Sequence, residues 1–419
     1  MSATQKPFPQ GKYIRPQICF HAKILYNKRM LKDRYLTRYI IEDLKDKMVF
    51  IGGPRQVGKT TLCRNFVATR FRKYAYFNWD NRADRQAIMA SSWPGDAQLL
   101  IFDEIHKYRQ WKSLIKGEYD KLKDIYKFLV TGSARLDLYR RGSDSLQGRY
   151  HYYRLHPFTL AEIEGINNKV SIGKSLDISR KSYQDALDAL DTFGGFPEPF
   201  IKQNRRVLRR WHNEKIERMF REDILDIQAV RDIANMKLLG DILPSKVGSL
   251  LSLNSIREDL EVSYRAASHW MDILESFYYH FRIYPFSAKK IRSLKKEPKL
   301  YLWDWSEIED EAARFENLIS SHLLKFVHFI TDYEGYRAEL YFLRDVDKHE
   351  VDFLVTIDSK PWFAVEAKLN DITLSSHLLY FKERLAIPYV YQVVKTAGID
   401  RLEKGVRIIS AGKLLSGMI

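Results

Sequence analysis

The 419-residue sequence has little cysteine, no long apolar run and no internal repeat. Its two cysteines, Cys19 and Cys63, cannot form a disulfide framework, which favours a reducing compartment. No apolar run approaches the roughly 18 residues that a membrane-spanning helix needs. The first residues also lack the charged start and apolar stretch of a secretory signal. These absences argue against a disulfide-rich secreted protein and a helical membrane protein, and we expect a cytoplasmic location.

What the chain does contain is apolar and basic side chains. A hydrophobic content of 45%, with 25 Tyr and 23 Phe, excludes a disordered chain, and the length suits two or three domains. The formal net charge is +16, which predicts an acidic partner, most commonly nucleic acid. Because the excess is not confined to one terminal tail, we expect basic patches on the folded surface. A generally basic protein without such a partner is the alternative.

The most informative segment is 53–60, which reads GPRQVGKT and matches the phosphate-binding pattern GxxxxGK[ST]. An apolar run at 48–51 precedes it as a buried strand would, and 60–67 follows with helical apolar spacing. Glycines let backbone N–H groups converge on phosphates, and the helix N-terminus adds partial positive charge. We therefore expect a nucleoside triphosphate to bind at Gly53, Pro54, Arg55, Gln56, Val57, Gly58, Lys59, Thr60 and Thr61. Lys59 would reach the β- and γ-phosphates, and the Thr60 hydroxyl would ligate Mg²⁺.

Further apolar runs, each ending in polar residues, predict the rest of this module. Strands are expected at 74–79, 98–104, 127–133 and 152–155, with helices between them, which predicts a parallel, doubly wound sheet. The carboxyl ends of such strands share one edge.

At that edge Asp103 would hold Mg²⁺ through its water shell, Glu104 would polarise the attacking water, and Thr131 or Ser133 would position that water or sense the γ-phosphate. An acidic pair alone is more often a solvated turn, but the phosphate-binding loop favours the catalytic interpretation.

The segments GPRQVGKTTL, LLIFDEIHK, VTGSARLD and SLQGRY together resemble the AAA+/STAND-related P-loop ATPases of prokaryotes. The resemblance implies that Asp103 and Glu104 are the Walker B pair and that the 131–133 turn is the first sensor. It also implies that Arg149, in the SLxGR segment, completes an ATP site in cis or from a neighbouring subunit, which makes a homo-oligomer plausible. The alternative is a surface or fold-stabilising arginine.

The middle of the chain is predicted to be helical. A GGFPE segment at 194–198 is similar to one in the same ATPase group, and a basic helix at 202–215 suits either phosphate contact or a solvated face. Three helices within 236–274 and a β-prone stretch at 277–286 resemble a winged helix, whose third helix would enter the DNA major groove. A helical lid is the competing interpretation. The candidate DNA-binding residues are Ser263, Tyr264, Arg265, Ser268 and His269 on the third helix and Lys289, Lys290 and Arg292 in a loop that also includes Lys299.

The C-terminal part is predicted to contain strands at 338–344, 350–356 and 361–368. Antiparallel pairing about Ser359 places Asp352 opposite Glu366, with Lys368 on the same face. This pattern resembles the PD-(D/E)xK nuclease fold, with Glu316 as the helical carboxylate. Two carboxylates would hold Mg²⁺ while the lysine orients the attacking water. A solvated cross-strand salt bridge is the alternative, and whether such a site cleaves DNA stays open.

The expected organisation is an N-terminal extension (1–39), an α/β, parallel-sheet, AAA+-like P-loop ATPase domain (40–165), a helical lid and winged helix (175–300), and an α/β restriction-endonuclease-like domain (301–419). The first functional hypothesis is an ATPase, using ATP and Mg²⁺, that couples hydrolysis to DNA remodelling or translocation. The second is an ATP-controlled nuclease, and the third is an ATP-driven switch that engages a protein partner.

Overall fold

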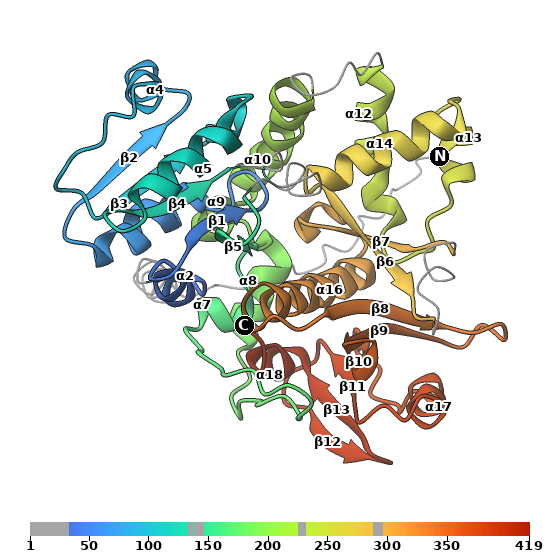
Figure 1. The fold of residues 1–419 in the computed structure, drawn as a ribbon. Helices are drawn as coiled ribbons and strands as arrows, with labels where there is room; N and C mark the ends of the chain where they lie inside the picture. The colour runs from blue at the N-terminus through green and yellow to red at the C-terminus, as the bar shows by residue number, and fades with distance from the viewer. Residues whose placement is uncertain (1–32, 133–135, 137–145, 225–231, 288–295) are drawn as a thin grey trace, which may run out of the picture.

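The computed structural model describes residues 33–132, 136, 146–224, 232–287 and 296–419 (Figure 1). Four of the candidate residues, Ser133, Lys289, Lys290 and Arg292, lie outside the described residues. Within the described part, no helix combines the length and apolar character that crossing a membrane would require.

The N-terminal module is built on a five-stranded sheet whose strands all run parallel, in the order β2-β3-β4-β1-β5. Its central strands are buried along their whole length, because helices cover both faces of a parallel sheet. This confirms the expected α/β sheet. The strands are β1 (Met48–Gly52), β2 (Tyr74–Asn78), β3 (Leu99–Asp103), β4 (Lys127–Thr131) and β5 (Tyr150–Arg154), and the helices are α2 (Thr37–Asp43), α4 (Arg82–Met89) and α5 (Trp111–Leu122).

The helix expected after the phosphate-binding loop is present. It begins as α3 (Lys59–Thr61) and continues through a π-helical turn, η1 (Leu62–Val67), and a 3-10 turn, η2 (Ala68–Arg70). Its four apolar side chains at 62, 63, 66 and 67 are all buried, as their spacing predicted.

The middle of the chain is helical, and polar caps mark where several helices begin. The side chains of Asn204, Asp232, Ser252 and Ser263 each accept a backbone N–H from the first turn of the helix that follows. The helices are α7 (Leu160–Ile163), α8 (Gln184–Phe193), α9 (Pro197–Lys202), α10 (Arg205–Arg218), α12 (Ile233–Ile242), α13 (Leu253–Asp259) and α14 (Tyr264–Ser276).

The C-terminal part centres on an eight-stranded sheet, in the order β12-β13-β11-β10-β9-β8-β6-β7, with the long helix α16 (Glu311–Phe329) lying across it (Figure 1). The three strands expected here are present. The strands are β6 (His280–Pro285), β7 (Lys299–Leu302), β8 (Ala338–Arg344), β9 (Glu350–Ile357), β10 (Lys360–Lys368), β11 (Tyr389–Val394), β12 (Asp400–Glu403) and β13 (Val406–Ser410), and the remaining helices are α17 (Ser376–Arg384) and α18 (Ala411–Ser416).

Residues 277–286, the stretch expected to form a wing, also take part in the C-terminal sheet. Their strand β6 pairs antiparallel with β7 and also parallel with β8, through Tyr284 and Tyr341. The hairpin therefore extends the C-terminal sheet, and the expected boundary at 300/301 falls inside β7. Periodicity along the sequence identifies a strand but not the sheet edge that it joins, which explains the difference.

The N-terminal module and the C-terminal part share one buried apolar cluster, which runs from β1 and β5 to α16 and β10. Polar contacts reinforce this interface. Arg154 at the end of β5 forms an ion pair with Asp332 at 2.7 Å, and the rings of His156 and His328 are joined at 2.8 Å. The phosphate-binding loop and α16 therefore lie on one continuous packed body.

Candidate functional site

The carboxyl edge of the parallel sheet brings the predicted catalytic segments together. The Thr60 hydroxyl donates to Oδ2 of Asp103 at 2.8 Å, and the Tyr76 hydroxyl donates to the same oxygen at 2.8 Å. The backbone N–H of Glu104 donates to the Thr131 carbonyl at 3.0 Å. The ends of β1, β3 and β4 therefore meet, as the alternation of strands and helices predicted.

The phosphate-binding loop has the backbone that its two glycines allow. Gly53 has φ = 133°, and a Cβ at this position would lie 2.5 Å from the Leu155 carbonyl oxygen. Gly58 has φ = 97° and leads directly into α3. The Lys59 ammonium folds back onto the loop, donating to the carbonyls of Gly53 at 2.9 Å and Pro54 at 2.7 Å. When a phosphate is bound, its oxygens would accept these hydrogen bonds from Lys59 in place of the two carbonyls.

Glu104 projects from a strained position immediately after β3. Its φ of 57° is left-handed, which is unusual for a residue with a side chain. Burial raises the pKa of Glu104, an effect that the nearby Lys59 ammonium partly offsets. A raised pKa makes the carboxylate a better proton acceptor near neutral pH.

A cavity of about 580 Å³ opens over this edge, which lies within the size range of small-molecule sites. One wall is unexpected, since Pro197, Glu198 and Ile201 of α9 face the loop. The GGFPE segment was the only sequence signal that could have placed α9 there. The lining residues are Arg55, Gln56, Gly58, Lys59, Thr60, Thr61, Asp80, Asp103, Glu104, Lys107, Pro197, Glu198 and Ile201.

A second polar cluster lies in the C-terminal sheet. Beside the turn, Lys360 pairs with Ile357 and Pro361 with Thr356, so the turn is centred between Asp358 and Ser359 and not on Ser359. An irregularity between Pro361 and Phe363 then shifts the pairing, and Val365 lies opposite Phe353, the register predicted about Ser359. Asp352 and Glu366 are the next residues along these two strands. Glu316, on α16, joins them through Lys299, whose ammonium lies 3.3 Å from both Glu316 and Asp352.

Two carboxyls of this cluster are weaker acids than usual. Burial, and then the charge of Asp352, raise the pKa values of Glu316 and Glu366 to about 7. Lys368 forms an ion pair with Glu366 at 2.8 Å. All four predicted residues, Glu316, Asp352, Glu366 and Lys368, therefore converge.

The third helix of the middle region, α14, exposes the face that the sequence assigned to DNA. Tyr264, Arg265 and His269 are exposed and Ser268 is half-buried, whereas Trp270 and its neighbours pack inward. The Ser263 side chain is occupied as the helix cap, where it accepts the N–H of Ala266.

Family models match three stretches of the chain. Residues 45–164 match the family model described as an AAA domain. This part of the chain is therefore similar to AAA domains, and its parallel sheet and phosphate-binding loop fit an α/β P-loop domain of that type. Residues 184–306 and 312–414 match two domains of unknown function, DUF8612 and DUF4143.

Relatives of similar length are found in bacteria and archaea. An uncharacterized protein of Mycobacterium tuberculosis is 24% identical over 327 residues, which cover 75% of this chain and 69% of the relative. An uncharacterized protein of Methanocaldococcus jannaschii is 22% identical over 382 residues, covering 85% and 83%.

Among solved structures, the RuvB Holliday junction branch migration motor of Thermotoga maritima matches with a TM-score of 0.30 and 20% identity, covering 66% of this chain and 95% of that one. The ORC1 protein of Aeropyrum pernix in complex with DNA matches with a TM-score of 0.28 and 14% identity, covering 73% and 94%. Scores this low do not establish a shared overall fold, so the assignment of the AAA domain does not depend on them.

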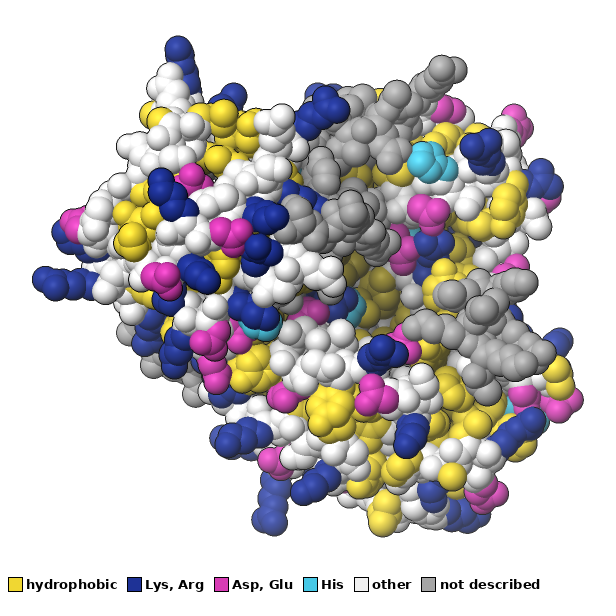
Figure 2. All heavy atoms as spheres, in the orientation of Figure 1, with side chains coloured by type: hydrophobic (Ala, Val, Ile, Leu, Met, Phe, Trp, Pro, Cys, Tyr) yellow, Lys and Arg dark blue, Asp and Glu magenta, His cyan; other side chains and the backbone are white. Residues whose placement is uncertain are grey.

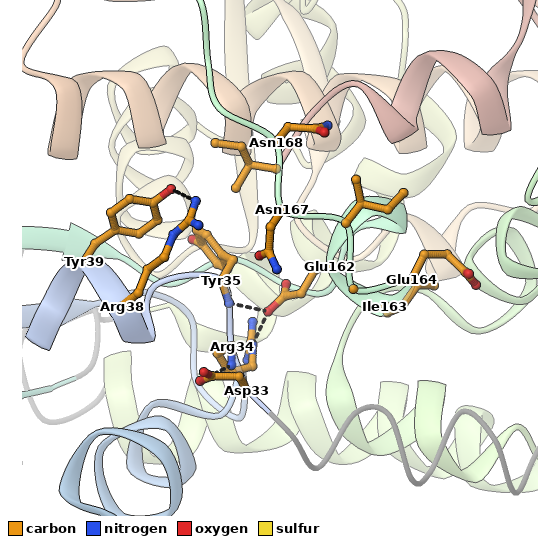
Figure 3. Close-up of a pocket in the computed structure, with 13 residues that line it drawn as sticks. Asp33, Arg34, Tyr35, Arg38, Tyr39, Glu162, Ile163, Glu164, Asn167 and Asn168 are labelled. Carbon is orange, nitrogen blue, oxygen red and sulfur yellow. Dashed lines mark hydrogen bonds and ion pairs between the residues drawn. The ribbon is translucent and has the colours of Figure 1, made fainter. Parts of the chain in front are cut away.

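Arg34 is a part of the AAA domain that the sequence did not reveal, because it falls within the expected N-terminal extension. Its guanidinium donates to the carbonyls of Val57 in the phosphate-binding loop and His156 after β5, both at 2.8 Å. It also pairs with Glu162 (Figure 3). Glu162 in turn pairs with Lys325 of α16 at 2.6 Å. These contacts join the back of the phosphate-binding loop to α16.

Two of the predicted ATP-site residues lie elsewhere. Arg149 precedes β5 at the amino edge of the AAA sheet, opposite the phosphate-binding loop, and forms a bidentate pair with Asp120. The five residues of β1 separate these edges by about 16 Å, so Arg149 does not complete the ATP site of its own chain. Thr131 is fully buried beside the Cys63 thiol and does not line the cavity.

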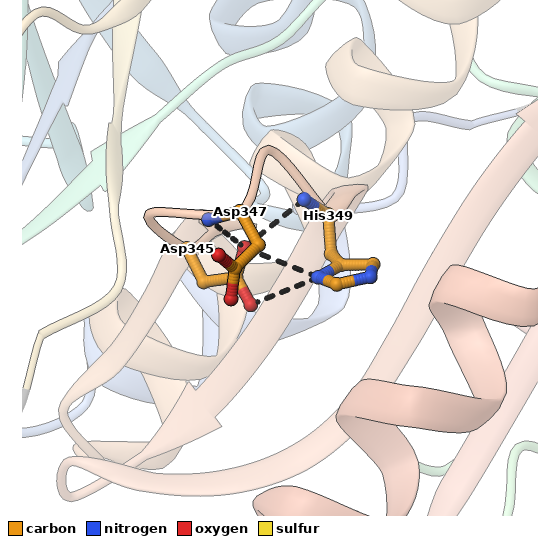
Figure 4. A group of neighbouring side chains, drawn as sticks. All are labelled: Asp345, Asp347 and His349. Atoms are coloured by element: carbon orange, nitrogen blue, oxygen red, sulfur yellow. Dashed lines mark hydrogen bonds and ion pairs between the residues drawn. The ribbon is translucent and has the colours of Figure 1, made fainter.

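Asp345, Asp347 and His349 lie close together in the β8–β9 turn (Figure 4). Asp345 Oδ1 accepts the backbone N–H groups of Asp347 and His349, both at 3.0 Å, and its carboxylate pairs with the His349 ring. These bonds fix the turn, and we assign the group that structural role.

Proposed function

We propose that this chain is a Mg²⁺-dependent ATPase that binds DNA and couples hydrolysis to remodelling of DNA or movement along it. The observation that carries the ATPase part is the meeting of Lys59, Thr60, Asp103 and Glu104 at one cavity on the carboxyl edge of the sheet. The DNA part rests on the exposed face of α14 and on the basic charge.

The residues at this edge fit a magnesium ion. Thr60 offers a hydroxyl and Asp103 a carboxylate, 2.8 Å apart, and hard oxygen ligands are those that Mg²⁺ prefers. When bound, the ion would neutralise charge on the β- and γ-phosphates. Backbone N–H groups of the loop and the Lys59 ammonium would bind the phosphates, and Glu104 would orient a water and accept its proton.

DNA binding is supported by the order of elements in the middle region. Helices α12, α13 and α14 are followed by the β6–β7 hairpin, and Leu250, between α12 and α13, bridges to Lys299 on β7. Three helices, a short bridging segment and a hairpin are the elements of a winged helix, in which the third helix reads DNA, and here the hairpin also extends the C-terminal sheet. Here that helix is α14, with Arg265 exposed near its start.

The distribution of basic residues indicates which parts of the chain could contact DNA phosphates. On the face shown in Figure 2, Lys and Arg side chains are interspersed with Asp and Glu and do not form one large patch. Residues 1–32 contain seven Lys or Arg and no acidic residue, and residues 288–295 contain four and none. We expect these two basic segments to contribute to salt-dependent binding.

The test is ATP hydrolysis in Mg²⁺ with and without duplex, forked and single-stranded DNA, followed by a gel of the same DNA. Stimulation by one DNA form without cutting supports a remodeller or translocase and identifies its substrate. Stimulation with cutting supports the ATP-controlled nuclease. Hydrolysis that no DNA affects supports the switch that engages a protein partner, and absence of hydrolysis contradicts the ATPase itself.

A further inference from the structure

The carboxylate cluster of the C-terminal sheet already contains a cation from the chain itself. The Lys299 ammonium lies 2.8 Å from Glu350 and 3.3 Å from each of Glu316 and Asp352. The side chain is only 4% exposed. We propose that Lys299 takes the place of a divalent cation, so that this cluster stays metal-free and does not cleave DNA in the native chain.

The backbone fixes Lys299 in this position from both sides. Lys299 pairs with Ile283 of β6 on one side and bridges to Leu250 on the other. A strand held on both edges cannot shift without losing these backbone hydrogen bonds. The ammonium is therefore built into the fold and is not a mobile surface charge.

Several of the carboxylate oxygens that a metal would use are already hydrogen-bonded. Asp352 uses Oδ1 for Lys299 and Oδ2 for the N–H of Ala367 at 2.9 Å. Oε1 of Glu316 accepts both Lys299 and the Tyr301 hydroxyl, the latter at 2.6 Å. Among the described residues of the cluster, only Oε2 of Glu366 is buried without a hydrogen-bond partner.

Charge also favours the lysine over a metal ion. Burial lowers the pKa of Lys299, but the three carboxylates around it together raise that pKa well above its usual value, so the group stays a cation. A divalent ion would have to enter beside this positive charge or expel it into an apolar setting that includes the Phe342 ring.

The lysine and the carboxylates come from different parts of the chain. Lys299 falls in the region that matches DUF8612, whereas Glu316, Asp352 and Glu366 fall in the region that matches DUF4143. The ion pairs of the cluster thus connect β7 of the β6–β7 hairpin to α16 and β9. The proposal is independent of the ATPase proposal.

The test is a Mn²⁺ titration of the full, nucleotide-free chain, with free Mn²⁺ followed by electron paramagnetic resonance. Lys299→Met removes the charge and keeps most of the volume, and Lys296→Met is the matched control, because Lys296 is exposed near the start of β7. We expect Asp352→Asn to leave the number of bound Mn²⁺ ions unchanged, both in the native chain and in Lys296→Met. Lys299→Met should gain one Mn²⁺ site per chain that Asp352→Asn abolishes, with affinity higher on the order of a hundredfold or more.

A Mn²⁺ site in the native chain that is lost in Asp352→Asn would overturn the proposal, and so would a folded Lys299→Met that gains none. If Lys299→Met does not fold, Lys299→Met/Glu350→Gln restores the charge balance and is titrated in its place. The comparison of the native chain with Asp352→Asn tests the proposal without either variant. The same samples, incubated with duplex DNA and Mn²⁺, should show no cutting by the native chain.

Discussion

Replacing Glu162 by Gln should destabilise the whole chain, because it leaves two buried cations without their anion. The Glu162 side chain is 4% exposed, and its two oxygens pair with Arg34 and with Lys325, whose side chain is fully buried. Although burial alone would raise the pKa of Glu162, the two cations hold that pKa below its usual value, so the group is a carboxylate in the fold.

The size of the effect follows from the burial. Removing one partner from a buried ion pair costs about 3–5 kcal/mol of unfolding free energy, because the remaining charge has no compensation. With about 2–3 °C of melting temperature per kcal/mol, the expected fall is about 6–15 °C. Urea unfolding followed by tryptophan fluorescence measures the free energy, and calorimetry measures the melting temperature.

Two further variants sharpen this test. Glu258→Gln makes the same chemical change at an ion pair with Arg257, where the Glu258 side chain is 66% exposed, and should cost less than about 0.5 kcal/mol. Glu162→Gln/Lys325→Met removes one stranded cation and should recover part of the lost stability. Equal losses in Glu162→Gln and Glu258→Gln, or no recovery in the double variant, would refute the reasoning.

Other perturbations test the remaining assignments. Lys59→Ala should abolish nucleotide binding in a fluorescent-nucleotide titration, and unchanged affinity would remove the phosphate-binding role. Glu104→Gln should keep ATP binding and lose turnover by at least about a hundredfold, so normal hydrolysis would exclude Glu104 as the proton acceptor. Arg265→Ala should weaken binding to duplex DNA, measured at one fixed salt concentration. In a salt titration the affinity for duplex DNA should fall as salt rises, and an affinity that does not change would contradict phosphate contacts. Burial lowers the pKa of Lys325 to about 8, below its value of 10.5 when unfolded. Between those pH values the unfolded chain binds more protons, so this group should make stability rise with pH, a slope that Lys325→Met should lose.

Much of the ATP site could be predicted from local patterns. The loop at 53–60, the strand endings at 103–104 and the rule that parallel strands share a carboxyl edge were enough to bring Thr60 and Asp103 together. The strands of the C-terminal hairpin were also predictable, but the turn did not determine their register near the carboxylates. The pairs beside the turn are one step off the predicted register, and the irregularity between Pro361 and Phe363 produces the pairing predicted about Ser359, which no turn rule could have shown.

Contacts between distant segments were not predictable in this way. Arg34 lies in a stretch without a motif, yet it supports the phosphate-binding loop. Arg149 carries a family motif, but its strand places it on the far edge of the sheet. Lys299 reads as one more basic residue of a loop, although in the fold it is buried among three carboxylates.

The sequence by itself determined which chemical groups this chain carries and where its strands, turns and phosphate-binding loop lie, because those depend on neighbouring residues. Only the tertiary structure decided which charges are buried together. Burial and long-range pairing arise when segments far apart in the chain pack on one core, as α16 does between the AAA sheet and the C-terminal sheet. Because of that packing, Lys299, which the sequence placed in a loop that could contact DNA, is the buried counter-ion of carboxylates within the chain.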